Sequence, residues 1–244
     1  MLTEITSKEN SSIKRAVKLL NKKHRDNLGL FLVEGLRAVQ DIISSRKDLV
    51  EEVFVTQEKR GFPFATAVVC DKVFKLLCET ENAQGVVAVI KKPVMAAKNC
   101  RSLFLDRVRD PGNLGTLIRT AAAVGFEDVY LFDSADAYSG KVVRSTMAAM
   151  IKVNLLNADT NTLFSLKNNG YTVVCADISG KNAYSYKQDS EKICLVIGNE
   201  ANGISSGIKE ICDVCLSLPM INGVESLNAA VSGSILMYNL KYLI

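Results

Sequence analysis

Six short apolar runs separated by helical patterns most constrain the fold of the second part of this chain. They are rich in Val, Ile, Leu and Phe, and they cover residues 102–105, 128–132, 153–156, 171–176, 193–198 and 214–219. Continuous apolar strands are typical of a parallel sheet that helices cover on both faces. Helices are expected over residues 113–124, 139–151 and 160–168 and from about Ser226 to the end. The pattern predicts an α/β domain whose ligands bind beyond the carboxyl ends of the strands.

Three loops that follow these strands combine glycine, asparagine and charge: residues 106–113, 198–205 and 219–228. In the first loop, Asp110, Pro111 and Gly112 indicate a turn, and Asn113 is expected to be the N-cap of the next helix. Arg119 is the odd residue on the apolar face of that helix. A turn with Asn at the helix start and Arg on its buried side indicates binding of an anion or a polar ligand.

The second and third loops add further polar candidates. The second loop leaves its strand at Gly198, where the missing side chain lets another molecule approach the backbone, and Glu200 is its only acid. In the third loop, Ser226 is expected to cap the last helix, with Asn228 in its first turn. An apolar loop beside capped polar groups suits a flat heterocycle. Ordinary turn chemistry and a plain helix cap stay open as alternatives.

The first part of the chain carries the whole excess of positive charge. The net charge is +4; residues 1–92 hold 16 Lys and Arg against 12 Asp and Glu, whereas residues 93–244 hold 14 of each kind. Basic residues are spaced along one expected helix: Lys14, Arg15, Lys18, Lys22, Lys23 and Arg25. Such a stripe favours contacts with phosphates, although an ordinary solvated helix face explains it equally well.

Residues 1–92 have the pattern of a small α/β domain. A helix is expected to begin near Ser11 or Ser12, and others to span residues 36–45 and 71–79. Strands are expected at residues 30–33, 51–56, 66–70 and 85–90. The weakly patterned residues 93–100 are interpreted as a linker to a second domain at residues 101–244.

The composition excludes several classes of protein. The chain is 48% apolar but lacks both an uninterrupted apolar stretch of about 20 residues and an apolar signal core, so we expect a globular, cytoplasmic protein without membrane association. Its seven cysteines are expected to be reduced thiols, and the Cys212–Cys215 pair lacks a second pair for a metal site. His24 is the only histidine, which argues against imidazole catalysis. Rossmann, P-loop and GxSxG motifs are absent.

The three loops resemble, in order and spacing, the three motifs of the SpoU-type branch of the SPOUT RNA methyltransferases. DPGNLGTLIRTAAAVGF at 110–126 is similar to the first motif, LVIGNEANGIS at 195–205 to the second, and LPMINGVESLNAAVSGSILMYNL at 218–240 to the third. KVVRSTMAAM at 141–150 resembles the connecting helix of the family. VEGLRAVQDII at 33–43 resembles the small N-terminal RNA-binding domain often attached to these enzymes, so the resemblance covers almost the whole chain.

This resemblance implies an enzyme that moves a methyl group from S-adenosyl-L-methionine to a ribose 2'-hydroxyl of RNA. It implies a trefoil knot in the C-terminal domain and a homodimer in which each active site borrows from both chains. The polar active-site set that it implies is Asn113, Arg119, Glu200, Ser226 and Asn228. It places Gly198, Leu218 and Leu227 around the cofactor, with backbone groups holding the adenine.

Two roles for Arg119 stay open. In the preferred one, the guanidinium grips a substrate phosphate and the hydroxyl, whose proton leaves through that phosphate or through water. In the other, Arg119 itself is deprotonated by its surroundings, although a free guanidinium is a very weak base.

The basic first domain is expected to dock the RNA, with Lys14, Lys18, Lys22 and Arg37 as candidate contacts. Large-subunit (23S) ribosomal RNA is the first expectation and transfer RNA the second, because similar two-domain chains act on ribosomal RNA. A non-catalytic RNA-binding protein that keeps the fold, and a methyltransferase that modifies a base, are the competing hypotheses.

Overall fold

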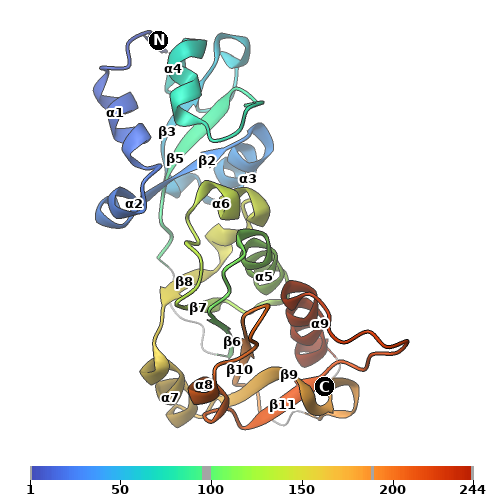
Figure 1. Ribbon diagram of the computed structural model, residues 1–244. Helices are drawn as coiled ribbons and strands as arrows, with labels where there is room; N and C mark the ends of the chain where they lie inside the picture. The colour runs from blue at the N-terminus through green and yellow to red at the C-terminus, as the bar shows by residue number, and fades with distance from the viewer. Residues whose placement is uncertain (1, 95–99, 188–189, 243–244) are drawn as a thin grey trace. The chain divides into compact units, whose positions relative to one another are not determined.

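The computed structural model describes residues 2–94, 100–187 and 190–242 (Figure 1). The chain divides into two compact units, one of Met1–Pro93 with Tyr138–Ile151 and one of Val94–Ala137 with Lys152–Ile244. The predicted domain bounds stay predictions, and residues 95–99 of the predicted linker lie outside the described residues. None of the helices in the described ranges has both the length and the apolar character that a membrane crossing requires.

The first unit is built on a mixed five-stranded sheet with the strand order β1-β4-β3-β5-β2. Strands β1, β4 and β3 run parallel, and β5 is antiparallel to β3 and β2. The strands are β1 (Thr3–Ile5), β2 (Leu30–Glu34), β3 (Val50–Val55), β4 (Ala67–Val69) and β5 (Val86–Lys91). The helices are α1 (Ser11–Lys18), α2 (Lys22–Leu28), α3 (Leu36–Arg46), α4 (Asp71–Phe74) and α6 (Gly140–Thr146). The predicted small α/β architecture is confirmed, and β1 is an addition that the sequence did not predict.

The basic segment of the first unit forms two helices, where the sequence predicted one. The Asn21 side chain accepts a hydrogen bond from the backbone N–H of Lys23 and so begins α2. The carbonyls of Leu19 and Leu20, left open at the end of α1, accept from the Arg25 guanidinium at 2.7 and 2.8 Å. Arg25 is therefore buried, and its assignment to an exposed basic stripe is wrong.

Residues 138–151 pack within the first unit, although they interrupt the sequence of the second. The Tyr138 ring lies 5.0 Å from the ring of Phe31, and Arg144 of α6 forms an ion pair with Glu79 at 3.2 Å. The helix predicted over residues 139–151 is shorter than expected. It ends at Thr146, the C-cap Met147 has a left-handed φ of 50°, and a 3-10 turn follows.

The second unit contains a six-stranded, all-parallel sheet with the order β11-β9-β10-β6-β7-β8. The strands are β6 (Arg101–Asp106), β7 (Asp128–Phe132), β8 (Asn154–Asn157), β9 (Thr172–Asn182), β10 (Ile193–Ile197) and β11 (Val214–Ser217). The helices are α5 (Pro111–Val124), α7 (Thr160–Asn168), α8 (Ser206–Lys209) and α9 (Ala229–Tyr242). The predicted parallel sheet is confirmed; the trefoil knot stays a prediction.

Helices cover both faces of this sheet, as the apolar strands predicted. On one face, Leu163 of α7 and Ile208 of α8 pack against Phe104 and Val196. On the other face α5 and α9 lie side by side (Figure 1), and Gly233 of α9 lies so close to α5 that a Cβ would overlap the Leu117 side chain. The sheet is thus buried on both sides, and its exposed carboxyl edge is available for a site.

Cys175 of β9 and Cys215 of β11 form a disulfide. The two residues are register partners on neighbouring strands, with Cα atoms 4.6 Å apart. The expectation that all the cysteines are reduced thiols is therefore wrong for this pair. Forty residues of sequence separate the two, so the pairing follows from strand register, which sequence spacing does not reveal.

Candidate active site

The three candidate loops meet at one edge of the second sheet. They follow β6, β10 and β11, which all run parallel, and β6 and β10 are direct neighbours with Leu105 opposite Ile197. The carboxyl ends of parallel strands meet at one edge, so loops far apart in sequence lie together. The polar residues of these loops are therefore placed to interact.

One side chain from each loop takes part in a continuous hydrogen-bonded chain. The Asn228 side-chain amide donates to Asn113 Oδ1 at 2.9 Å, and the Asn113 amide donates to Glu200 Oε1 at 2.9 Å. The chain of donors and acceptors thus runs in one direction, from the third loop through the first to the second. Three of the five polar site residues expected from the sequence are thus in contact.

Asn113 is free for this role because another residue caps its helix. Helix α5 begins at Pro111, and its N-cap is Asp110, whose carboxylate accepts from the backbone N–H of Asn113 at 2.8 Å. The prediction that Asn113 is the N-cap is wrong by three residues. An Asp followed by Pro at the first helical position is the stronger start signal, and it leaves the Asn113 side chain to bridge the other two loops.

Asn228, and not Ser226, caps the last helix. The Asn228 side-chain oxygen accepts from the backbone N–H groups of Ala230 and Val231 at 2.9 and 3.2 Å, and α9 begins at Ala229. Asn228 therefore uses its oxygen to start α9 and its amide to hold Asn113. Ser226 lies in the exposed loop before the helix.

A cleft of about 450 Å³ opens beside this chain of side chains. It is lined by residues from all three of the last strands and their loops, among them Asp177, Gly198, Glu200, Leu218, Ser226 and Leu227. The three residues assigned to the cofactor by resemblance, Gly198, Leu218 and Leu227, therefore line one cavity. Asn113, Arg119 and Asn228 are not among its lining residues.

Gly198 is required by the fold of its own loop. Asn199 and Gly203 exchange backbone hydrogen bonds of 3.0 and 2.9 Å, which turn the loop back on itself. A Cβ on Gly198 would overlap the backbone of Gly203 and Ile204. The close approach that the sequence predicted is thus made by the chain itself.

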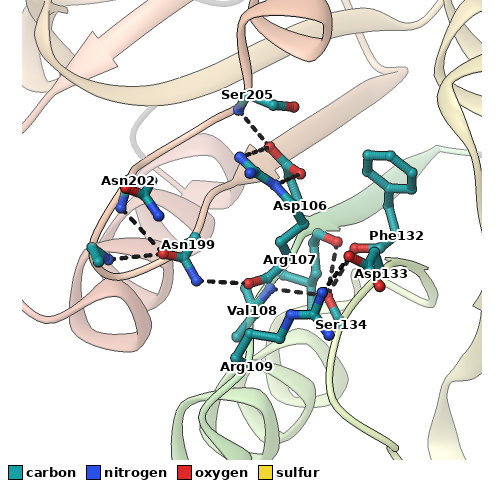
Figure 2. Close-up of polar contacts among 12 residues, drawn as sticks. Asp106, Arg107, Val108, Arg109, Phe132, Asp133, Ser134, Asn199, Asn202 and Ser205 are labelled. Atoms are coloured by element: carbon teal, nitrogen blue, oxygen red, sulfur yellow. Dashed lines mark hydrogen bonds and ion pairs between the residues drawn. The ribbon is translucent and has the colours of Figure 1, made fainter.

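Asn199 organises the second loop, and the sequence patterns did not single it out. Its side-chain oxygen accepts from the backbone N–H groups of Ala201 and Asn202, and its amide donates to the Arg107 carbonyl at 2.9 Å (Figure 2). An Asn side chain that accepts from the backbone N–H two residues later forms an Asx turn. The sequence signal for this turn is an Asn directly after a glycine that ends a strand.

Asp177, on the cleft wall, carries a shifted pKa. Burial alone would raise the pKa of this carboxyl, but hydrogen bonds from Lys209 and from Ser179 outweigh it and lower the pKa. The Lys209 ammonium lies 2.5 Å from Asp177 Oδ2. The cleft therefore holds an ionised carboxylate at neutral pH.

Comparison with protein families agrees with this arrangement. The model of the SpoU rRNA methylase family matches residues 101–238, and that of the MRM3-like substrate binding domain matches residues 10–88. The chain belongs to the SpoU rRNA methylase family. The family match covers the whole of the loop edge described above.

Similar proteins extend the family match over the full chain. The 23S rRNA (guanosine(2553)-2'-O)-methyltransferase RlmP of Bacillus subtilis is 34% identical over 98% of this chain and 100% of its own. An AdoMet-bound rRNA methyltransferase from Sinorhizobium meliloti superposes with a TM-score of 0.83 at 26% identity, covering 98% of this chain and 97% of the other. A structure described as an RNA 2'-O ribose methyltransferase has a TM-score of 0.77 at 25% identity, with 97% of both chains covered.

Arg119 of this SpoU family member stands apart from the hydrogen-bonded chain. It is exposed, where the sequence predicted the buried side of the helix, and it forms no hydrogen bond or ion pair with any residue that the structure describes. It lies six positions after Asn113 in α5, which corresponds to a rise of about 9 Å along the helix axis and a rotation of about 240° around it. Its guanidinium donors are therefore open to a ligand or to a second chain.

The basic candidates for RNA contact are all exposed in the first unit, but they differ in their partners. Lys14 forms an ion pair with Glu9, and Lys22 forms one with Asp26. Lys18 and Arg37 form none with the described residues. Among the four predicted RNA contacts, Lys18 and Arg37 are thus the two whose positive charges are not paired with a carboxylate of the described residues.

Proposed function

We propose that this chain transfers a methyl group from S-adenosyl-L-methionine to a ribose 2'-hydroxyl of large-subunit ribosomal RNA. The observation that carries the proposal is the Asn228–Asn113–Glu200 chain of hydrogen bonds beside a cleft formed by the second and third loops. Membership of the SpoU family and the named activity of the Bacillus subtilis relative support it.

The cleft fits the chemistry of the proposed cofactor. A volume of about 450 Å³ lies within the range of about 300–1,000 Å³ typical of small-molecule sites. Leu218 and Leu227 provide apolar walls for an adenine, and β11 is an edge strand, which offers backbone N–H and C=O groups for its polar edge. Asp177 and Glu200 offer negative charge to a cationic group. When bound, the cofactor supplies a methyl carbon on a sulfonium centre.

Asn113, Glu200 and Asn228 hold the three loops in fixed geometry, and Ser226 contributes a hydroxyl to the cleft wall. A ribose hydroxyl is a poor nucleophile, so it must be aligned with the methyl carbon and must lose its proton. We assign this polar set to holding the ribose at the mouth of the cleft. Glu200, Ser226 and Asn228 are exposed, as contact with RNA requires.

Arg119 is assigned to the substrate phosphate. A guanidinium presents donors in a planar fork that matches phosphate oxygens, and those of Arg119 are not used by the described residues. In this role it holds the phosphate and the hydroxyl together, and the hydroxyl proton leaves to that phosphate or to water. Deprotonation of Arg119 itself is the second version.

The working form is proposed to be a homodimer. The outer face of α9 exposes Val231, Tyr238 and Tyr242, and Tyr238 and Tyr242 line an apolar groove of about 420 Å³ together with Tyr184. A second copy of the chain would cover this face. The position of Arg119 on a different face of α5 from Asn113 supports a site that is completed by Arg119 of the partner subunit. Light scattering on the purified chain tests the dimer, and a monomer at micromolar concentration would contradict it.

The RNA is proposed to dock on the first unit, which matches a substrate-binding domain family. Lys18, Arg37, Lys14 and Lys22 supply the salt-sensitive part of the affinity. Ribosomal RNA is the proposed class because the Bacillus subtilis relative is named for it; transfer RNA is the second candidate. A cytoplasmic location belongs to the same proposal.

Transfer of a labelled methyl group from the cofactor to total RNA of a strain lacking this gene tests the function. We expect label in large-subunit ribosomal RNA, in one dinucleotide that resists alkali because its 2'-oxygen is methylated. Label that remains in mononucleotides after alkaline hydrolysis would indicate a base methyltransferase. Label found only in transfer RNA would identify transfer RNA, and not ribosomal RNA, as the substrate. Counts equal to those of a heat-killed control would indicate a non-catalytic RNA-binding protein.

A further inference from the structure

Asp106 is a fully buried carboxylate at the last position of β6, with 0% of its surface exposed. A buried charge is unfavourable unless it is paired and hydrogen-bonded, so a chain that keeps one needs compensation close by. Asp106 does not line the cleft. Its role must therefore be sought in what its two oxygens hold.

Both oxygens of Asp106 are occupied. Oδ1 accepts from the Arg107 guanidinium Nε at 2.9 Å, and Oδ2 accepts from the backbone N–H of Ser205 at 2.6 Å (Figure 2). The second contact joins residues 99 positions apart and ends the loop that carries Glu200. Asp106 thus ties the far end of the second loop to the end of β6.

A second tether holds the near end of the same loop. The Asn199 amide donates to the backbone carbonyl of Arg107 at 2.9 Å. Arg107 has a left-handed φ of 58°, uncommon for a residue with a side chain, and its own N–H donates to Phe132 at 2.8 Å. Residues 106 and 107 therefore fix both ends of the 199–205 segment through two different groups, the Asp106 carboxylate and the Arg107 carbonyl (Figure 2).

The segment between the two tethers forms part of the cleft wall. Residues 199–203 line the cleft, and the backbone hydrogen bonds between Asn199 and Gly203 close them into a compact turn. A turn that is internally closed moves as one body, so its place in the cleft depends on what anchors it. Release of the Ser205 N–H would leave one anchor in place of two.

We propose that Asp106 is a positioning residue that sets the affinity of the cleft for the cofactor by anchoring the 199–205 segment. This inference rests on the proposed function, since it takes S-adenosyl-L-methionine as the ligand. Asp106 acts through the Ser205 N–H and through Arg107, and it contacts no reacting atom. Asn199 is its counterpart at the other end of the segment.

Binding of S-adenosyl-L-methionine and of S-adenosyl-L-homocysteine by calorimetry tests this role without turnover. Asp106→Ala removes the acceptor for Ser205, and we expect its dissociation constant to rise about 10- to 100-fold, since charged hydrogen bonds are strong. Asp106→Asn keeps an oxygen for Ser205 but loses the charge facing Arg107, so we expect a smaller rise, about 3- to 10-fold. In turnover, KM for the cofactor should rise by a larger factor than KM for RNA, because the first unit supplies most of the proposed RNA contacts.

Asp128→Asn is the matched control. Asp128 is also a buried carboxylate of the same sheet, 2% exposed, but it begins β7 and accepts from the Asn154 amide at 2.7 Å. It therefore lies at the opposite strand ends from the cleft. We expect it to lower stability as Asp106→Asn does, while its affinity for the cofactor equals that of the wild type.

Asn199→Asp and hydrogen exchange complete the test. Asn199→Asp keeps the oxygen that holds Ala201 and Asn202 but loses the amide that holds Arg107. In the double variant, the loss of cofactor affinity should differ from the sum of the two single losses, because Asn199→Asp and Asp106→Asn both release the same 199–205 segment. In both variants the exchange of amides 199–205 should accelerate at least tenfold, with the rest of the sheet unchanged.

The outcomes separate this inference from the proposed function. A wild-type chain that binds neither compound contradicts the function and the inference together. A wild-type affinity in the folded Asp106 variants, or unchanged exchange at residues 199–205, contradicts the positioning role and leaves the proposed function standing. Loss of affinity in Asp128→Asn equal to that in Asp106→Asn would reduce the effect to general stability and overturn the inference.

Discussion

The Asn228 side chain donates to Asn113 Oδ1 at 2.9 Å across 115 residues of sequence. Its own oxygen meanwhile accepts from the first N–H groups of α9, so one side chain both starts a helix and joins two loops. Asn113 passes the contact on to Glu200. A substitution of any one of these three residues should therefore change the positions of all three loops.

Asn113→Ala should lower methyl transfer about 100-fold, because it removes the link between Glu200 and Asn228 and lets the loops move relative to one another. The melting temperature should fall only slightly, since the lost hydrogen bonds are near the surface. Single-turnover rates at saturating RNA and cofactor provide the measurement. Asn168→Ala, an exposed amide at the end of α7, is the control and should leave the rate unchanged. A rate within threefold of wild type in Asn113→Ala would contradict a joint role for the chain.

Arg119→Ala and Arg119→Lys should both lose at least 100-fold in methyl transfer, since a single ammonium cannot replace the fork of a guanidinium. Their free energy of unfolding should stay within about 0.5 kcal/mol of wild type, because exposed Arg119 has no partner among the described residues. Denaturant titration and turnover assays on the same preparations check both points. Thr116→Ala, at another exposed position of α5, is the control. Near-normal turnover by Arg119→Lys at saturating RNA would argue against both proposed roles.

Gly198→Ala should destabilise the chain by about 1–3 kcal/mol and abolish cofactor binding, because the added methyl group overlaps the backbone of Gly203 and Ile204. Gly207→Ala is the matched control: beyond its chain neighbours and the backbone of its own helix, no atom lies within 4 Å of the added Cβ, and the residue lies in α8. It should be neutral or stabilising by up to about 1 kcal/mol. Thermal unfolding and calorimetry separate the two. Normal cofactor binding by Gly198→Ala would contradict the proposal that the cofactor binds in the cleft lined by the second loop.

Lys18→Gln should weaken RNA binding and reduce the slope of log affinity against log salt by about 0.7–0.9, the value for one phosphate contact. Lys18 is exposed and unpaired within the described residues, whereas Lys14 and Lys22 have carboxylate partners and should each show a smaller change. Fluorescence anisotropy with a ribosomal RNA fragment at several salt concentrations gives the slope. Lys152→Gln, in the 3-10 turn after α6, should leave it unaltered. An unchanged slope in Lys18→Gln would remove that residue from the interface.

Asp177→Asn should lower stability at pH 7 and converge with wild type in acid. Hydrogen bonds from Lys209 and Ser179 hold the folded pKa of Asp177 below its ordinary value, against the opposing effect of burial. A carboxyl whose pKa is lower in the folded than in the unfolded protein stabilises the fold at pH values above its unfolded pKa of about 3.9. This stabilisation is lost as the pH falls through the pKa of the folded state. Urea unfolding of both proteins between pH 7 and pH 3 measures the difference. Asp41→Asn, which changes an exposed carboxylate on α3, is the control for the loss of one surface charge. If the difference in unfolding free energy between wild type and Asp177→Asn stayed constant across this pH range, the ionised Asp177 carboxylate would not contribute to stability.

The sequence by itself determined the second sheet and the three loops at its edge. Continuous apolar runs are a local property, so the pattern of residues was enough to predict a parallel sheet with loops 106–113 and 198–205 at the carboxyl ends of its strands. Motif resemblance supplied Asn113, Glu200 and Asn228 as a set. The hydrogen bonds that join them confirm their proximity but could not be read from spacing, since 87 and 115 residues separate the partners.

Only the tertiary structure decided the finer assignments. Asp110 caps α5 and Asn228 caps α9, because a cap is chosen by which side-chain oxygen reaches the free N–H groups. Arg25 is buried because carbonyls at the end of α1 bind it, and Cys175 meets Cys215 because two strands share a register. Asp106 looks like any strand-ending acid in the sequence; its hold on Ser205 exists only because β6 and β10 are neighbours. Local patterns fix which elements form, whereas long-range contacts fix which side chains meet.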